Sequence, residues 1–186
     1  MTEAHHRRSI RLQGYDYTQD GAYFVTLCTH QRALLFGDVV GDDMELNTLG
    51  CIVLEEWERT ATLRPYIELD AFVIMPNHLH GIIIINWGDV GARRAVPLQT
   101  ECFGKPVSDS IPTVVRAFKS ATTRRVNQVR LTPGESVWQR NYYEHIIRSE
   151  GALNQIRQYI HLNPANWLSD ENHPGSFCST SGLHTF

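Results

Sequence analysis

The chain has 186 residues, of which 42% are hydrophobic and 20% charged, as in an ordinary globular protein with enough length to bury one core. Its formal net charge of −3 does not indicate a nucleic-acid binder, and its longest apolar run, near residues 82–85, is far shorter than the roughly 18 residues of a membrane span. The four cysteines are widely separated and the first residues are polar and basic, so we expect no disulfide framework, no signal peptide, no membrane partner and a cytoplasmic location.

The first half of the chain predicts a basic arm, a strand and a helix. Residues 1–20 contain the clustered arginines of the arm, and residues 21–29 are rich in the aromatic and β-branched residues that favour strands. Residues 42–46 are typical of a turn or a short extended piece. Thr48 then offers an N-cap to a helix over residues 49–62, which ends before a proline.

The second half continues with two strands that we expect to be antiparallel neighbours. They cover residues 67–75 and 79–86, and the Pro76-Asn77 pair between them predicts a tight reversal. After a loop rich in Gly and Pro, helical spacing returns over residues 111–129. The last predicted elements are a strand with an irregular approach within residues 136–147 and a helix over residues 149–162.

This order of elements, β-α-β-β-α-β-α, predicts an α+β fold. It fits the ferredoxin-like split βαβ arrangement, with an antiparallel sheet of four to five strands and two helices on one face, plus an additional C-terminal helix. We expect one domain over residues 21–167, between the N-terminal arm and a loose polar tail at residues 168–186.

The most informative motif is His78-Leu79-His80 at the start of a predicted strand. Alternate side chains of a strand share a face, so the two imidazoles point the same way and can supply two ligands to a divalent metal. The alternative is a polar pair that only satisfies hydrogen bonds near the surface.

The last predicted helix places Tyr159 and Asn163 four residues apart, and therefore on one face beside its apolar stripe. Asn163 directly precedes Pro164 at the helix end, where its side chain has two possible roles. It can cap the chain locally or reach a nearby metal.

Basic side chains cluster in two places. A cluster of this kind is either a solvated face or a nucleic-acid-binding surface. It indicates a nucleic-acid-binding surface only where a catalytic site lies beside it. The arm contributes Arg7, Arg8 and Arg11, and the helix over residues 111–129 contributes Arg116, Lys119, Arg124 and Arg125.

Three blocks of sequence, in order along the chain, resemble one known family. They are Met75-Pro76-Asn77-His78-Leu79-His80, Trp138-Gln139-Arg140-Asn141-Tyr142-Tyr143 and Tyr159-Ile160-His161-Leu162-Asn163-Pro164. Together they look like the single-tyrosine HUH transposases of small insertion sequences, in particular the REP-associated tyrosine transposases. The similarity covers roughly residues 7–167 and includes the Gly14-Tyr15-Asp16-Tyr17 segment.

The resemblance implies a fold and a site. The family's fold is the ferredoxin-like core, its metal-binding histidine pair corresponds to His78 and His80, and its nucleophile corresponds to Tyr159. The third metal ligand corresponds to Asn163, and the metal would be Mg²⁺ or Mn²⁺. The implied function is transposition: cleavage and rejoining of single-stranded DNA near a hairpin, such as a repetitive extragenic palindrome, through a 5′-phosphotyrosine. Relatives act as dimers or monomers, and the sequence does not indicate which of these oligomeric states this chain adopts.

Other tyrosines and histidines could take part in a site, and three other functions are compatible with the same residues. Tyr142 and Tyr143 fall in the fourth predicted strand, where core packing explains them, and His145 is expected to be structural. The rival functions are a non-catalytic DNA-binding regulator, a nuclease in which the metal activates water, and a replication-initiating nickase.

Overall fold

The computed structural model describes residues 15–88 and 107–175, and its main sheet has four antiparallel strands in the order β4-β5-β1-β6. The strands of this sheet are β1 (Gly21–Cys28), β4 (Ile67–Met75), β5 (His78–Ile85) and β6 (Tyr143–Ile147). The helices are α1 (Thr48–Thr62), α2 (Ile111–Arg130) and α3 (Glu150–Leu162), with short 3-10 turns at His30–Arg32 and Trp167–Ser169.

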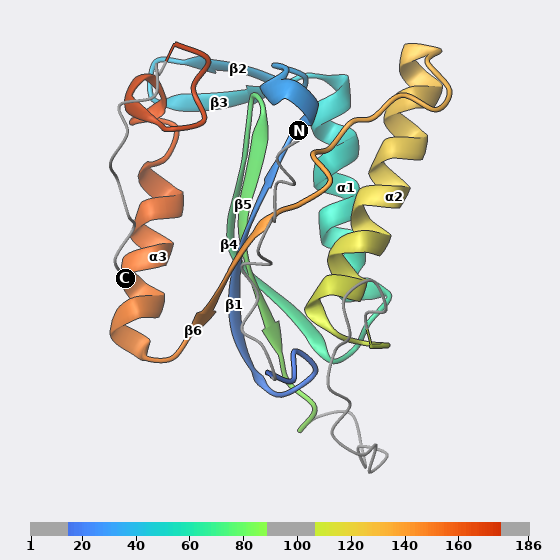
Figure 1. Cartoon of the computed structure of the whole chain (residues 1–186). Helices are drawn as coiled ribbons and strands as arrows, with labels where there is room; N and C mark the ends of the chain where they lie inside the picture. The colour runs from blue at the N-terminus through green and yellow to red at the C-terminus, as the bar shows by residue number, and fades with distance from the viewer. Residues whose placement is uncertain (1–14, 89–106, 176–186) are drawn as a thin grey trace, which may run out of the picture.

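The three helices cover the two faces of this sheet unequally. Helices α1 and α2 lie side by side on one face, and α3 lies alone on the other (Figure 1). The β1-α1-β4-β5-α2-β6 order with this strand pairing is the ferredoxin-like split βαβ arrangement, and α3 is the additional C-terminal helix. The predicted fold class is therefore confirmed. None of the helices in the described ranges is both long and apolar enough to cross a bilayer.

Each face of the sheet has its own hydrophobic core because side chains alternate along β5. Leu79 and Ile83 pack in the larger core with α1 and α2, whereas Ile82 packs in the smaller core with α3. His78 and His80 have the same parity as Ile82, so both imidazoles face α3. The pleat of one strand thus fixes which helix meets the histidine pair.

Local boundaries differ from the predicted ones in three places. The N-cap of α1 is Asn47 and not Thr48, because the Asn47 side chain accepts hydrogen bonds from the N–H groups of Leu49 and Gly50. Residues 37–46 form a hairpin of two strands, β2 (Gly37–Val40) and β3 (Asp43–Leu46), where the sequence indicated only a turn or a short extended piece at residues 42–46. The last strand of the sheet covers only residues 143–147, and the segment before it makes a single bridge, between Trp138 and Thr29.

Gly81 follows the two histidine-bearing positions and precedes the apolar half of β5, and it lies directly against Trp57 of α1. A Cβ atom at this position would overlap the Trp57 indole and approach the Phe72 side chain at 3.3 Å. The close contact between strand and helix therefore requires glycine here.

We predict that Gly81→Ala lowers the free energy of unfolding by about 1–3 kcal/mol, because the added methyl overpacks a rigid contact. Gly151→Ala is the matched control, since nothing lies within 4 Å of a Cβ at that helical position. The control should leave the free energy unchanged or raise it by up to about 1 kcal/mol. Urea unfolding of the two variants measures both effects, and equal stability of the two would contradict the packing argument.

Candidate active site

The histidine pair lies side by side at the start of β5, directly after the turn that joins it to β4. Both side chains are buried, with exposed fractions of 0% for His78 and 2% for His80, and their ring centroids are 4.5 Å apart. The structure therefore brings the two imidazoles together as the strand spacing predicted.

His78 presents an unpaired nitrogen to the site. Its Nδ1 lies 2.9 Å from Asn77 Oδ1, and the Asn77 amide nitrogen donates to the carbonyls of Arg32 and Asn172, so Oδ1 must accept and Nδ1–H must donate. Nε2 is then a lone-pair acceptor, and it is buried without a hydrogen-bond partner. Burial lowers the pKa of His78 to about 4, so the imidazole is neutral at neutral pH, as a metal ligand must be.

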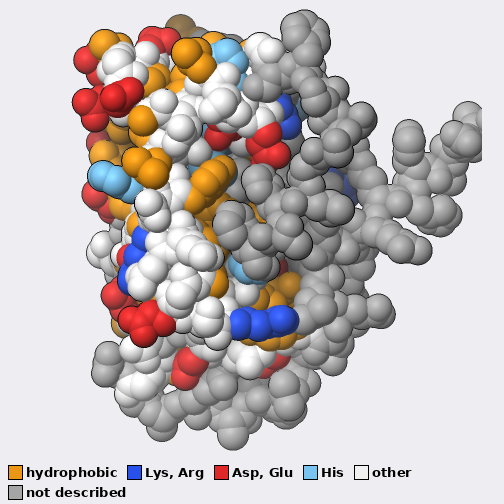
Figure 2. Space-filling model, turned by 90° about the vertical axis from the view of Figure 1, so that its left-hand side faces the viewer, with side chains coloured by type: hydrophobic (Ala, Val, Ile, Leu, Met, Phe, Trp, Pro, Cys, Tyr) orange, Lys and Arg blue, Asp and Glu red, His pale blue; other side chains and the backbone are white. Residues whose placement is uncertain are grey.

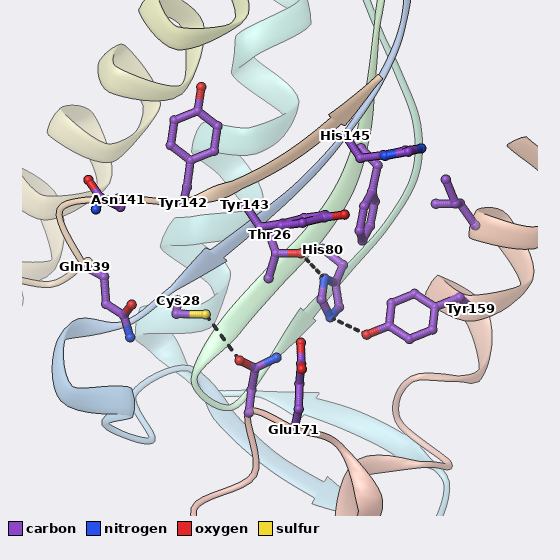
Figure 3. Close-up of a pocket in the computed structure, with 13 residues that line it drawn as sticks. Thr26, Cys28, His80, Gln139, Asn141, Tyr142, Tyr143, His145, Tyr159 and Glu171 are labelled. Atoms are coloured by element: carbon purple, nitrogen blue, oxygen red, sulfur yellow. Dashed lines mark hydrogen bonds between the residues drawn. The ribbon is translucent and has the colours of Figure 1, made fainter. Parts of the chain in front are cut away.

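His80 is held by a second pair of contacts and joins the histidine site to α3. Its Nδ1 lies 2.8 Å from Thr26 Oγ1 on β1, and its Nε2 lies 3.2 Å from the Tyr159 hydroxyl (Figure 3). The Phe24 ring stacks on the imidazole at a centroid distance of 5.5 Å. Two strands and one helix therefore fix the orientation of this ring.

Tyr159 reaches the site because α3 is fixed across the sheet. The helix begins at the Ser149 N-cap, whose side chain accepts from the Ala152 N–H, and Arg157 pairs with Asp70 of β4 at 2.7 Å. Burial and then the charges of Asp170 and Glu171 raise the pKa of Tyr159 above its ordinary value, so the phenol is protonated while it lies within hydrogen-bond distance of His80 Nε2.

The third group at the site is Asp170, which the sequence did not predict. One nitrogen of His78, one nitrogen of His80 and one carboxylate oxygen of Asp170 all lie within 4.8 Å of one another. Asp170 is 8% exposed and lies after α3, in the segment that we expected to be a loose polar tail. Only its acidic character, a few residues after Asn163, was available as a signal in the sequence.

Asn163 lies beside this group of three. It is 3% exposed, its amide nitrogen donates to Asp170 Oδ2 at 3.0 Å, and its Oδ1 is buried without a hydrogen-bond partner. The site thus contains one imidazole nitrogen and one amide oxygen that are buried lone-pair acceptors with no donor. With the Asp170 carboxylate and His80, these groups form a donor set of nitrogen and oxygen atoms that fits a divalent metal ion.

The basic residues of α2 do not converge on this site. Helix α2 covers the face of the sheet opposite α3 (Figure 1). Arg116 and Arg124 are exposed there, whereas Arg125 pairs with Glu55 and Glu56 of α1. Lys119 donates to the backbone carbonyls of residues 139 and 140, and burial lowers its pKa to about 8. Arg7, Arg8 and Arg11 lie outside the described residues.

The surface on the α3 side has mixed character. Figure 2 shows acidic, basic and hydrophobic side chains interspersed over its described part, without a continuous basic area.

Two aromatic residues that we assigned to the core have different surroundings. Tyr142 precedes β6, packs against the larger core and donates from its hydroxyl to Glu144. Tyr143, in contrast, is 39% exposed and lines a cavity beside Tyr159, as does His145. Core packing therefore accounts for Tyr142 and not for Tyr143, as expected if neighbouring side chains at this edge of the sheet point to opposite faces.

Known proteins resemble the chain in sequence and in structure. No family model matches it. A relative from Haemophilus influenzae, described as "Uncharacterized protein", is 44% identical over 173 residues, which are 90% of this chain and 93% of the relative. A second Haemophilus influenzae protein, described as "Putative REP-associated tyrosine transposase", is 26% identical over 152 residues, which are 80% of this chain and 73% of that protein.

A solved structure of a REP-associated tyrosine transposase bound to a REP hairpin has the same fold. It aligns with a TM-score of 0.55 and 21% sequence identity, over 90% of this chain and 74% of that chain. The resemblance indicated by the three motif blocks is thus confirmed in sequence and in fold.

We predict that Asp170→Asn weakens the binding of Mn²⁺ by roughly 10-fold or more, because the change removes the only carboxylate that the described site contributes to the group of three. Isothermal titration with MnCl₂ measures the affinity. The exposed Asp38→Asn variant removes the same charge outside the site and should bind like the wild type. Equal affinity of Asp170→Asn and wild type would exclude Asp170 as a ligand.

Proposed function

The chain belongs to the same family as the 44% identical Haemophilus influenzae relative, and its resemblance to REP-associated tyrosine transposases leads us to propose that it is a single-stranded DNA transposase. It would cleave and rejoin DNA near hairpins of the repetitive extragenic palindrome type, through a 5′-phosphotyrosine on Tyr159. The observation that carries this proposal is the 3.2 Å contact between the Tyr159 hydroxyl and His80, inside the cluster that also contains His78 and Asp170.

The residues of the cluster fit a divalent cation. His78, His80 and Asp170 would hold it, and the unpartnered Oδ1 of Asn163 is a fourth donor at the same place. Mixed imidazole and oxygen donors suit Mn²⁺, and the oxygen donors also suit Mg²⁺. Such an ion, when bound, neutralises charge on a scissile phosphate and orients it.

Tyr159 would act as the nucleophile because its position is fixed before substrate arrives. The phenol gives up its proton to solvent as its oxygen attacks the phosphorus, and the bond from phosphorus to the 3′ oxygen breaks. The released 3′ oxygen takes up a proton, which leaves a free 3′-hydroxyl on the strand. The 5′ end stays bound to Tyr159 as a phosphodiester, so a later attack by another 3′-hydroxyl rejoins DNA and restores the phenol.

The surroundings of Tyr159 also explain why the free enzyme would be unreactive. Burial and the neighbouring carboxylates keep the phenol protonated, so it is a poor nucleophile on its own. A cation near Asp170 offsets that negative charge and makes the phenolate easier to form. Binding of the metal would therefore increase the reactivity of Tyr159.

We predict that Tyr159→Phe abolishes a covalent protein–DNA product that the wild type forms. The assay incubates labelled single-stranded hairpin DNA from the flanks of the chain's own gene with protein and Mn²⁺ or Mg²⁺, and separates the products on a denaturing gel. Without the hydroxyl no phosphotyrosine can form, so the shifted band disappears although the ring and its packing remain.

Tyr66→Phe is the matched control, since it removes a tyrosine hydroxyl that donates to Asp109, in the core on the other side of the sheet. This variant should give the wild-type band. Cleavage that survives Tyr159→Phe would indicate a nuclease with metal-activated water, and hairpin binding without cleavage by the wild type would indicate a DNA-binding regulator.

A further inference from the structure

A cavity of about 260 Å³ lies next to the Tyr159–His80 pair, on the side where β6 forms the edge of the sheet (Figure 3). This volume is below the roughly 300–1,000 Å³ of sites that take drug-sized ligands, so the cavity has room for one ring system and little more. Its lining is mainly aromatic at the base and amide-bearing at the rim, and the residues used below are Phe24, Tyr143, Tyr159, Gln139, Asn141 and Asn172.

Aromatic rings give the cavity flat walls. Phe24 lines it, with the Tyr143 ring 6.2 Å away at 67° and the Tyr159 ring 6.1 Å away at 85°. Phe24 is itself buried and stacked on His80, so it cannot move far, whereas Tyr143 exposes 39% of its surface. An exposed ring on a rigid edge strand is available for stacking with a ligand.

Asn172 supplies an unsatisfied donor at this cavity. Its backbone N–H donates to Asp170, its carbonyl accepts from Asn77, and its side-chain Oδ1 accepts from Cys28 Sγ at 3.4 Å. These contacts fix the residue, which is 3% exposed, yet its Nδ2 is buried and makes no hydrogen bond. A buried amide donor without a partner costs free energy, and a ligand with an acceptor at its edge would satisfy it.

We propose that this cavity binds one unpaired nucleobase of the nucleotide that flanks the scissile phosphate. The inference rests on the proposed function and names the part of the substrate that the site recognises besides the phosphate. Tyr143 stacks on the face of the base, and Asn172 Nδ2 donates to an acceptor on its edge. Tyr159 lines the same cavity, so a base seated there places its own phosphate beside the nucleophile.

The chemistry of the lining favours a base over other small groups. Nucleobases are flat and carry hydrogen-bond acceptors on their edges, so they can use stacking rings and amide donors together. Gln139 and Asn141 add further amides at the rim, each able to donate and accept. A lipid or an apolar ligand would leave Asn172 Nδ2 unsatisfied, and a second phosphate would meet Glu171, which also lines the cavity.

The test uses hairpin oligonucleotides with 2-aminopurine at successive positions of the single-stranded flank, bound to the Tyr159→Phe variant so that cleavage does not intervene. We expect fluorescence to be quenched at one position, next to the bond that the wild type cleaves, because the base stacks on an aromatic ring there. Adding Tyr143→Ala should remove this quenching and weaken binding roughly fivefold or more, while adding Tyr143→Phe keeps both.

The contact with the base edge is tested by a double-mutant cycle that combines a change in the protein with a change in the DNA and compares the binding affinities. Asn172→Asp replaces the donor by an acceptor of the same shape, and an abasic site at the quenched position removes the base. The variant should weaken binding of the intact oligonucleotide more than binding of the abasic one, since the added charge affects both equally and only the first loses a hydrogen bond.

The outcomes separate this inference from the function on which it rests. Binding of the hairpin without position-specific quenching, or with quenching that Tyr143→Ala leaves intact, overturns the base site and leaves the transposase proposal standing. A wild type that neither binds nor cleaves any hairpin oligonucleotide overturns both.

Discussion

The arrangement of the site depends on the pleat of one buried strand. Because β5 alternates its side chains strictly, His78 and His80 emerge on the face opposite Leu79 and Gly81 and meet α3. The position of Gly81 under Trp57 fixes the register on the other face, so the strand cannot slip by one residue without placing both imidazoles in the larger core. The packing of one face of the sheet thereby determines that the two imidazoles lie on the other face.

Three of the buried polar atoms that lack a hydrogen-bond partner in the described residues lie close together at this site. They are Nε2 of His78, Oδ1 of Asn163 and Nδ2 of Asn172. An unsatisfied buried group costs about 1–3 kcal/mol, so a cluster of them persists only where neighbouring contacts hold the groups in place. Here Asn77, Asp170 and the Asn172 backbone provide these contacts. The two acceptors would suit the proposed cation, and the donor would suit the edge of the proposed base.

The sequence predicted the features that follow from periodicity and failed where long-range contacts decide. Alternation and helical spacing correctly placed His78, His80 and Tyr159, because strand and helix geometry relate neighbours directly. Asp170 and Asn172 lie in a segment of irregular structure after α3, and no local pattern indicates that it folds back onto Asn77. The partners of Arg125 and Lys119 on α2 could not be predicted either, because they also lie far away in the sequence.

Intramolecular partners also determine whether a charged side chain is available to bind a ligand. Arg125 is paired with two carboxylates of α1, and the Lys119 ammonium group is occupied by backbone carbonyls, so neither side chain is freely available on the surface. These contacts join elements far apart in sequence, which composition and spacing do not reveal. The face that carries Tyr159 has instead a small set of well-fixed groups, and its recognition of DNA would be correspondingly local.

The most direct test of this account is mass spectrometry of the covalent product. Wild-type protein would be incubated with a single-stranded hairpin oligonucleotide and Mn²⁺, digested with protease and nuclease, and searched for a peptide that carries a nucleotide. We expect a phosphate-linked nucleotide on the peptide containing Tyr159, attached at the phenol. A nucleotide on Tyr143 or on any other residue, or cleaved DNA with no modified peptide, would contradict it.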